Sequence, residues 1–462
     1  MVARARWLVL CALPALGACK SPEAEARAHP TPATSPSHGS ATSSSASAPP
    51  AAASSVPLPE AAAPGAREPL NVVLILVDSL RWDMPWNGYS RPVAPFLTRF
   101  EKESVSYVYG YSISSSTSKS VLPMLAGKYP SEMARGAYFF TYWYPQNLSL
   151  PEMLGNDYKP SLGIFSHAYF FPATGVTQGF APAYTLPNTV LNNQSTENIT
   201  SERLTDAAIR HLRSPTLADQ RDGKRFFAYV HYMDPHSPYL HHEGRPEWGT
   251  QPRDYYDQEV HFADEHVGRL ITWIRRQPFG KHTAIIVSAD HGESFAEHGH
   301  LKHGYEVWEE LVRVPWFFWL PGAQSRRIDT PRSHIDMCRT ILDLMGKTAP
   351  DGVRGKSLVP ELFGESPEER TVIVDLPRDN LQDRRRAYVQ GRHKLIVAGD
   401  DKRFLLFDVV ADPRERKNLA DKDRETLRKM KRIHDAAQAE IPMAEVRGDL
   451  PQLRDAPEGR RY

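Results

Sequence analysis

Two unbroken apolar runs that each lead to acidic residues constrain the fold most strongly. One run, Asn71–Val77, is followed directly by Asp78, and the other, Ala284–Val287, leads within three residues to Asp290 and His291. Runs without polar alternation are typical of strands that are covered on both faces, as in parallel sheets. In open α/β sheets, ligands bind at the carboxyl ends of the strands. The sequence therefore predicts an α/β fold in which these polar side chains lie at a ligand site.

The side chains at these strand ends are of kinds that bind metal ions. Carboxylate oxygen and imidazole nitrogen both suit zinc and manganese, so Asp290 and His291 can form a metal-binding pair. The alternative is that the pair only caps its loop, as Asp78 can cap the turn that follows its own strand. The two strand ends alone leave both interpretations open.

A third candidate segment is the Ser/Thr-rich loop within 107–130, which opens a helix expected to end near Gly127. A helix N-terminus presents free backbone N–H groups and the positive end of the helix dipole, so it attracts anions. A hydroxyl at that point would lie beside a bound oxyanion. A plain N-cap is the alternative interpretation of the same residues.

The N-terminal part predicts export and a tether. Basic residues precede an apolar run, Trp7–Leu16, that is too short to span a bilayer, and Leu-Gly-Ala-Cys at its end resembles a lipobox. That resemblance implies a signal peptide over 1–18 and a lipid on Cys19, which would anchor the chain to the outer membrane or the periplasmic face of the bacterial envelope. An ordinary signal peptide with a chance cysteine is the alternative. Residues 19–69 are rich in Ala, Ser and Pro, and we expect a disordered tether there.

The remainder is long enough for one large core with a subdomain. The whole chain carries 56 basic and 55 acidic residues, a net charge of +1, which argues against nucleic-acid binding as its main role. Once the signal peptide is removed and Cys19 is lipidated, Cys338 is the remaining cysteine of the sequence. No intrachain disulfide is therefore expected.

The order of several motifs resembles the sulfatase family of the alkaline-phosphatase superfamily. The matching segments are the strand and acid at 71–78, Leu125–Pro130, Asp290–Glu293, Arg313–Pro315 and Pro321-Gly322. The resemblance covers most of the chain after residue 70. It implies an alkaline-phosphatase-like α/β domain over 70–346, with a large central β-sheet flanked by helices. A small C-terminal antiparallel sheet subdomain over 347–446 and a polar tail over 447–462 would follow.

The resemblance also implies a nucleophile and a metal site. In sulfatases the nucleophile lies ten residues before the glycine that corresponds to Gly127, which places it at Thr117. Sulfatases convert Cys or Ser at this position to formylglycine, which threonine cannot form. A threonine here resembles the phosphotransferase and phosphodiesterase branches, where its hydroxyl attacks phosphorus directly. The implied ligands of one divalent ion are Asp78, Thr117, Asp290 and His291.

The expected identity of the metal follows from the same resemblance. The second acid of the family's acidic pair is replaced by Ser79. The loss of one hard carboxylate ligand, together with the imidazole of His291, favours zinc or manganese, with calcium possible.

Further residues are assigned by resemblance. Lys119 is the nearest cation to the nucleophile, His236 lies in a loop that resembles the family's HxPHxPY segment, and His303 falls where the family has a residue near the leaving-group oxygen. His167 is a weaker candidate for binding substrate. A loop histidine bonded to backbone is the alternative for His236. The aromatic run Tyr138–Tyr144 either lines the pocket mouth, where it would stack on a sugar or aryl group, or belongs to the core.

Elsewhere the pattern predicts secondary structure without chemistry. Helical spacing covers Ser333–Met345 and the last amphipathic segment, about 422–437, and Asp257, Glu259 and Asp264 on a further helix are expected to be solvated or capping. Short strands are expected at 372–375, 386–390, 393–397 and 404–408.

These observations predict an exported, lipid-tethered, metal-dependent hydrolase of sulfate or phosphate esters. Its partners would be a sulfated or phosphorylated small molecule or glycan and, through the lipid anchor, a membrane, with no nucleic acid. One alternative is a transferase that moves a phospho-substituent onto envelope glycans or lipids. Another is a degenerate sulfatase fold that only binds anionic glycans.

Overall fold

The computed structural model describes residues 67–189, 198–399, 401–444 and 446–448. The predicted signal peptide, Cys19 and nearly all of the predicted tether lie outside the described residues, as does most of the predicted tail. Among the residues that are described, no helix combines the length and the apolar character that a membrane crossing requires.

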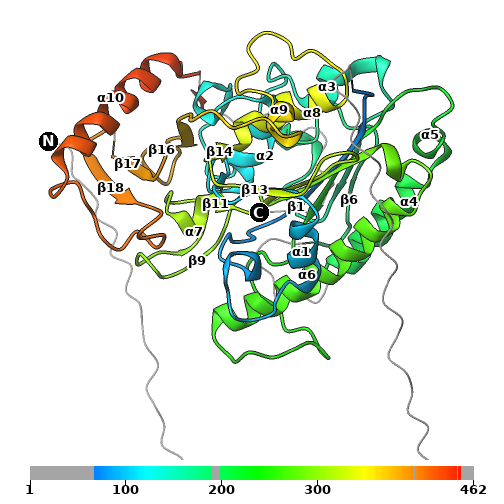
Figure 1. Cartoon of the computed structure of the whole chain (residues 1–462), viewed down its shortest axis with the longest axis horizontal. Helices are drawn as coiled ribbons and strands as arrows, with labels where there is room; N and C mark the ends of the chain where they lie inside the picture. Colours follow the sequence, from blue (N-terminus) through cyan, green and yellow to red (C-terminus); the bar gives the residue numbers. More distant parts are fainter. Residues whose placement is uncertain (1–66, 190–197, 400, 445, 449–462) are drawn as a thin grey trace, which may run out of the picture. The chain divides into compact units, whose positions relative to one another are not determined.

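A mixed sheet of eight strands lies at the centre of the described structure (Figure 1). Its strands are β1 Asn71–Val77, β2 Val105–Tyr107, β5 Leu162–Phe165, β6 Ala183–Thr185, β7 Phe227–Tyr232, β8 Thr283–Ser288, β12 Trp316–Trp319 and β13 Arg326–Ile328. Their order is β13-β2-β12-β8-β1-β7-β5-β6. Strand β1 lies between β8 and β7 and is parallel to both, so the carboxyl ends of these three strands meet at one edge. The two predicted apolar strands are confirmed as neighbours at the centre of the sheet.

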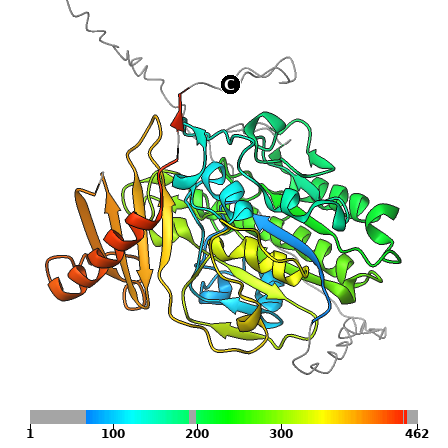
Figure 2. The ribbon, with the colours of Figure 1, turned by 90° about the horizontal axis from the view of Figure 1, so that it is seen from above.

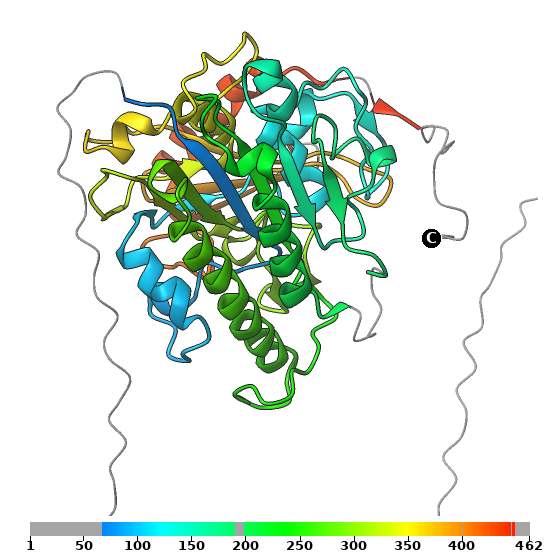
Figure 3. The ribbon, with the colours of Figure 1, turned by 90° about the vertical axis from the view of Figure 1, so that its right-hand side faces the viewer.

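Helices cover both faces of this sheet, as Figures 1 and 3 show. The helices are α1 Pro95–Lys102, α2 Thr117–Ala126, α3 Leu150–Leu154, α4 Ser201–Leu212, α5 Pro215–Ala218, α6 Pro252–Arg275, α7 Glu309–Val312, α8 Met337–Leu344, α9 Val359–Leu362 and α10 Arg424–Glu440. Because successive side chains of β1 point to opposite faces, Val72 and Leu74 pack with α2 and α8, whereas Val73 and Ile75 pack with α1, α4 and α6. This arrangement confirms the α/β fold.

A smaller antiparallel sheet follows in the C-terminal part, with α10 packed on it (Figure 2). Its strands are β15 Val372–Leu376, β16 Arg385–Gln390, β17 His393–Ala398 and β18 Arg403–Asp408, which confirms the predicted strands. The Lys394 ammonium on β17 is buried 3.0 Å from carboxylate oxygens of both Glu309 and Glu415. Since Glu309 begins α7, this ionic cluster joins the small sheet to the segment that follows β8.

Several two- or three-residue strands complete the pairing among the described residues. They are β3 Gly110–Tyr111, β11 Arg313–Val314 and β14 Arg332–Ser333 in one small sheet, β9 Ser294–Phe295 with β10 Leu301–Lys302, and β4 Arg135–Gly136 with β19 Val446–Arg447. Strand β19 crosses the predicted start of the tail at residue 447.

The acidic residues of α6 correct one prediction. Asp257, Glu259 and Asp264 are buried rather than solvated. Asp264 does cap a helix, since its carboxylate accepts the backbone N–H groups of Phe96 and Leu97 at the start of α1. Glu259 accepts the N–H of Leu240. Helix α6 is therefore buried over a wider part of its surface than its amphipathic sequence pattern predicts.

Replacing Glu259 with glutamine is expected to stabilise the protein at alkaline pH. Burial raises the pKa of Glu259 to about 8, above the ordinary value of about 4.3 in an unfolded chain. The folded state therefore binds the extra proton between these values, and the free energy of unfolding falls as pH rises through that range. The amide keeps an acceptor for Leu240 without ionising, so we expect a gain of about 2 kcal/mol above the folded pKa.

Thermal or urea unfolding of both proteins at about pH 5 and about pH 9 measures this difference. The stability gap should open only at the higher pH. A gap of equal size at both values would contradict the assigned titration.

Candidate active site

Asp78, Thr117, Asp290 and His291 come together where β1 and β8 end. The Thr117 Oγ1 atom lies 3.1 Å from Nε2 of His291 and 3.3 Å from Oδ2 of Asp78. Nε2 of His291 in turn lies 3.5 Å from a carboxylate oxygen of Asp78 and 3.5 Å from one of Asp290. All four side chains are buried. Segments that are far apart in the sequence thus enclose one small polar space.

Helix α2 positions Thr117 in this cluster. Thr117 is the first residue of α2, and the preceding Ser116 has extended backbone. The helix ends at Gly127 in left-handed backbone with φ 61°, where an added Cβ would lie 2.6 Å from Cγ1 of Val353. Glycine is therefore needed there for both conformation and space. With its far end fixed in this way, α2 holds its N-terminus and the Thr117 hydroxyl at the strand ends.

The chemistry of this cluster fits a divalent cation. Asp78, Asp290 and His291 each offer a ligand atom, and these atoms lie within 4.8 Å of one another. Oδ2 of Asp290 is buried without a hydrogen-bond partner among the described residues, which is unfavourable for a bare carboxylate oxygen. His291 donates its Nδ1–H to the carbonyl of Gly292 at 2.9 Å, so its Nε2 lone pair is free to face the carboxylates.

The charge on Asp78 is maintained by its surroundings. Burial disfavours the carboxylate, but the nearby imidazoles, His236 foremost, hold the pKa of Asp78 well below its usual value. An ionised carboxylate at the end of β1 is the form that binds a cation.

His231 belongs to the same cluster, although the sequence analysis gave it no role. Its Nε2 lies 3.2 Å from Oδ2 of Asp78 and its Nδ1 lies 2.6 Å from the hydroxyl of Tyr229. A carboxylate only accepts, so Nε2 carries the proton and Nδ1 accepts from Tyr229. The alternation of side chains along β7 could have revealed the role of His231 from the sequence. His231 is paired in register with Leu76, two residues before Asp78, and shares a face with Tyr229.

Replacing Tyr229 with phenylalanine is expected to weaken metal binding up to about 10-fold, the lower end of the effect of losing a group bonded to a metal ligand, because Tyr229 acts on Asp78 through His231. The change removes the donor that fixes the His231 ring and, through it, the Asp78 carboxylate. Calorimetric titration with zinc or manganese measures the affinity. Tyr232→Phe is the matched control, because its hydroxyl is also buried on β7 but bonds to Thr205. Equal affinities in wild type and Tyr229→Phe would contradict the orienting role.

His167 and His236 lie on the other side of Asp78, with ligand atoms close enough for a second metal trio. The hydrogen bonds of His167 argue against that use. Its Nδ1 accepts the N–H of Tyr169 at 3.0 Å, so its Nε2 carries the proton and acts as a donor. His236 has the opposite arrangement, since its Nδ1 lies 2.6 Å from the carbonyl of Ser237 and its Nε2 is the acceptor. His167 can therefore donate a hydrogen bond to an oxygen of a bound ester, and His236 can accept one from a hydroxyl group of that ester.

His303 completes the cluster, with its ring centroid 4.2 Å from that of His291 and 4.9 Å from that of His236. Its Nδ1 lies 3.1 Å from Oε1 of Glu293, a buried carboxylate that the sequence analysis did not single out. Burial lowers the pKa of His303, but Glu293, together with Asp78 and Asp290, outweighs burial and raises the pKa above its usual value. His303 is thereby suited to hold a proton that it can give to a leaving group.

Lys119 has a different position from the one predicted. Its ammonium lies 2.9 Å from Oδ2 of Asp379 and 2.8 Å from the carbonyl oxygen of Phe139, and it is fully buried. Two residues after Thr117 on a helix, its side chain leaves α2 in another direction. Its charge is used in a buried ion pair with the loop between β15 and β16. Imidazole N–H groups, such as those of His167 and His231, act as hydrogen-bond donors at the cluster instead.

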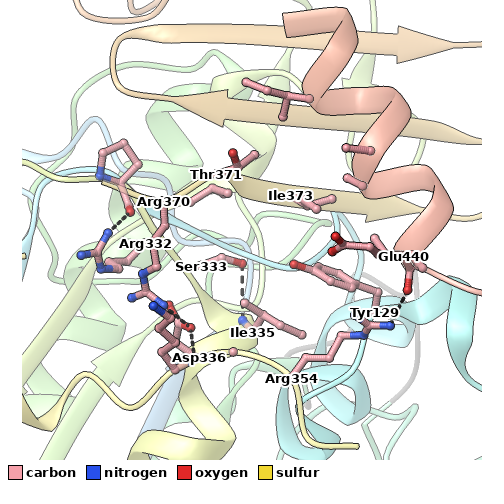
Figure 4. A pocket seen from close by; sticks show the side chains of 18 residues that line it. Tyr129, Arg332, Ser333, Ile335, Asp336, Arg354, Arg370, Thr371, Ile373 and Glu440 are labelled. Carbon is pink, nitrogen blue, oxygen red and sulfur yellow. Dashed lines mark hydrogen bonds and ion pairs between the residues drawn. The ribbon is translucent and has the colours of Figure 1, made fainter. Parts of the chain in front are cut away.

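Several cavities of about 520 to 580 Å³ lie among the described residues, away from this cluster. One of about 520 Å³ lies between β15, α10 and the segment around Ser333 (Figure 4). Its guanidinium groups are already paired, Arg332 with Glu361, Arg354 with Glu132 and Arg370 with Asp336. Because the strand-end cluster, and not this cavity, holds an unpaired carboxylate oxygen beside a hydroxyl, it is the candidate active site.

Comparison with known proteins gives matches to two family models and to several relatives. The Sulfatase family model matches residues 70–347, and a model described as N-sulphoglucosamine sulphohydrolase, C-terminal, matches residues 296–440. The chain is 24% identical over 268 residues to the uncharacterized sulfatase YidJ of Escherichia coli, covering 48% of this chain and 51% of that protein. It is 31% identical over 205 residues to the choline-sulfatase of Rhizobium meliloti, covering 42% and 39%.

Solved structures show the same fold. A 2-O GAG sulfatase, BT1596, superimposes with a TM-score of 0.67 at 18% identity, covering 81% of this chain and 92% of that one. The phosphonate monoester hydrolase of Silicibacter pomeroyi gives 0.66 at 19% identity, covering 81% and 96%. Among the curated relatives given above, the match spans about half of the length or less.

Proposed function

The chain belongs to the sulfatase family, and we propose that it hydrolyses a sulfate or phosphate ester with Thr117 as the nucleophile. The observation that carries the proposal is the position of the Thr117 hydroxyl. It lies at the N-terminus of α2, 3.1 Å from Nε2 of His291 and 3.3 Å from the Asp78 carboxylate.

Asp78, Thr117, Asp290 and His291 would hold one divalent ion, with zinc or manganese favoured and calcium possible. When bound, such an ion lowers the pKa of a hydroxyl and draws charge from ester oxygens. The tautomers support a single ion, because the Nε2 of His167 carries a proton and is a donor rather than a ligand. We propose that His167 donates this proton to a non-bridging oxygen of the ester.

The proposed reaction uses groups of this chain at both ends of the bond that breaks. The Thr117 oxygen attacks sulfur or phosphorus, with its hydroxyl proton directed at Asp78 as in the structure. The bond to the leaving oxygen breaks, and His303, whose Nδ1 faces Glu293, protonates that oxygen from its Nε2. Water then attacks the covalent ester on Thr117 and releases sulfate or phosphate. Threonine cannot become formylglycine, so direct attack on phosphorus is the favoured variant.

The names of the relatives suggest substrate classes to try. They include a choline-sulfatase, a 2-O GAG sulfatase and a phosphonate monoester hydrolase. A screen of purified protein that begins after the tether, against aryl sulfates, phosphomonoesters, phosphodiesters and sulfated glycosaminoglycan fragments, tests the proposal with zinc, manganese and calcium in turn. Absence of turnover with every ester and ion would overturn it.

Transfer of a phospho-substituent to an acceptor alcohol is the second candidate. The same Thr117 intermediate would be resolved by an acceptor hydroxyl in place of water. Product analysis with and without an added alcohol separates the two, because a transferase gives a new ester only when the alcohol is present. A protein that only binds anionic glycans would bind metal without turnover, and Thr117→Ala would leave its ligand affinity unchanged.

We also propose that the enzyme is exported and held at the bacterial envelope through a lipid on Cys19. Support comes from the lipobox-like sequence and the Ala/Ser/Pro-rich segment that follows it. Mass spectrometry of the mature N-terminus and fractionation of a Cys19→Ala variant test this proposal. A variant that stays in the membrane fraction would contradict it.

A further inference from the structure

We propose that Phe139, Phe140 and Tyr305 form an aromatic platform that binds a ring in the leaving group of the ester by stacking; this inference rests on the proposed cleavage at Thr117. The ligand class is an ester whose alcohol part carries a six-membered ring with an apolar face, as a pyranose sugar or an aryl group does.

The three rings pack together and remain accessible. The rings of Phe139 and Tyr305 are stacked, with centroids 5.1 Å apart and planes at 24°, and Phe140 meets Phe139 edge-on at 5.3 Å. Phe140 is 45% exposed and Tyr305 is 40% exposed. They come from two loops more than a hundred residues apart in the sequence, 137–142 and 303–308. The predicted aromatic run therefore does not lie wholly in the core, although Trp143 within it is buried.

The aromatic platform lies beside the reacting groups. Gly304 stands between His303 and Tyr305, and a Cβ added to it would lie 2.7 Å from Cζ of Phe139 and 3.4 Å from Cβ of Ser116. Ser116 directly precedes Thr117. The platform is thus next to both the proposed nucleophile and the histidine proposed to protonate the leaving oxygen. A group that departs on the His303 side would extend over these rings.

Buried polar contacts fix the platform to the nucleophile helix. The carbonyl of Phe139 accepts hydrogen bonds from Nζ of Lys119 and Oγ of Ser118, both on α2. The Lys119 ammonium also lies 4.7 Å from the centroid of the Phe139 ring. This assigns Lys119 a positioning role, because it joins the first turn of the helix that bears Thr117 to the loop that bears the rings.

The small C-terminal sheet fixes the same loops from the other side. Asp379 accepts from Lys119, and the neighbouring Asn380 accepts the N–H of Phe139 and donates its own N–H to the carbonyl of Ala137. Gln382 donates its side-chain amide to the carbonyl of Gly304. One loop between β15 and β16 thereby holds both ring-bearing loops. Such support is what an exposed aromatic surface needs in order to present fixed ring faces.

Stacking of a ligand ring accounts for the exposed and rigidly held aromatic side chains better than non-specific apolar contact does. Exposed aromatic rings offer flat apolar area with little conformational freedom to lose, and they bind other flat ring faces in offset or edge-on geometry. An acyclic alcohol has no such face. The platform should therefore discriminate ring-bearing esters from acyclic esters with the same reacting group.

The test compares kcat/KM for an aryl ester, a sugar ester and an acyclic alkyl ester in wild type, Phe140→Ala and Tyr305→Ala. We expect each substitution to lower kcat/KM for the ring-bearing esters about 5- to 10-fold, mainly through KM, and to change the alkyl ester less than about 2-fold. Tyr305→Phe keeps the ring and should keep the wild-type values. Leu148→Ala, at a position that is also 45% exposed, is the matched control for loss of apolar surface.

The comparison of sugar and aryl esters identifies the kind of ring that binds, and the binding measurement separates the platform from the proposed hydrolysis. Loss confined to the sugar ester assigns a carbohydrate, and loss confined to the aryl ester assigns an aryl group. An equal loss with all three esters, or no loss with any, would overturn the platform. Equilibrium binding of the same esters to Thr117→Ala, with and without Phe140→Ala, gives a readout that does not need turnover. Ring-selective binding without wild-type turnover would overturn the proposed hydrolysis but not the platform.

Discussion

Thr117→Ala is expected to lower turnover of every ester substrate by about 10³-fold or more, the scale of effect seen when a covalent nucleophile is removed. The hydroxyl lost is the atom proposed to form the covalent intermediate, and neither neighbouring carboxylate is placed to replace it at the same point. The fold should be unaffected, because α2 keeps its length and its C-terminal cap at Gly127. Steady-state kinetics and thermal unfolding of the variant measure both expectations.

Two further variants make this prediction specific. Thr117→Ser keeps a hydroxyl at the same place and should retain most of the activity. Thr98→Ala removes a threonine hydroxyl from the surface helix α1, where it bonds only to the carbonyl of Ala94, and should leave kinetics unchanged. Burst kinetics should show a covalent intermediate in wild type and none in Thr117→Ala. Wild-type rates in Thr117→Ala on any ester that the enzyme cleaves would refute the assignment.

The positions of the strand-end residues could be predicted because each depends on a short stretch of sequence. An apolar run followed by Asp78 and another that leads to Asp290 and His291 are local patterns, whereas Thr117 is placed by the sulfatase resemblance, ten residues before Gly127. The α/β sheet then brings them together, since parallel neighbours share one carboxyl edge. Fold and cluster therefore follow from the same feature of the sequence.

The partners of these residues could not be predicted in the same way. Lys119 was expected to contact the ester, but its charge is paired with Asp379, which comes from the C-terminal sheet. Nothing near Lys119 in the sequence indicates that partner. By contrast, His231 could have been found, because strand alternation places it on the face of Tyr229 and beside Asp78.

The tautomers of the histidines show most clearly what the three-dimensional structure adds. The sequence assigns His236 by resemblance and makes His167 a weaker candidate for binding substrate, but it shows the tautomer of neither ring. Their backbone contacts differ, because one Nδ1 accepts a backbone N–H and the other lies at a backbone carbonyl. This difference makes one Nε2 a donor and the other an acceptor. These contacts favour the proposed single metal ion over two.

Asp290→Ala is expected to abolish binding of the divalent ion. The variant loses the carboxylate whose Oδ2 is buried without a hydrogen-bond partner among the described residues. Asp78 is then the one carboxylate left beside His291 in the proposed ligand set, which is too little negative charge to hold a divalent cation away from water. Wild type should bind one equivalent of zinc or manganese. At an ion concentration of about 100 Kd, binding should stabilise wild type by about 2.7 kcal/mol, and this stabilisation should vanish in the variant.

Metal analysis of the dialysed proteins and thermal unfolding with and without added ion measure the two expectations separately from activity. Asp264→Asn is the matched control, since Asp264 is also a buried carboxylate but caps α1 far along α6 from the strand ends. It should bind metal as wild type does. Because an uncompensated pair of buried carboxylates is unfavourable, Asp290→Ala without metal should be no less stable than metal-free wild type. Full metal occupancy in Asp290→Ala would show that the ion, if bound, lies elsewhere than between the ends of β1 and β8.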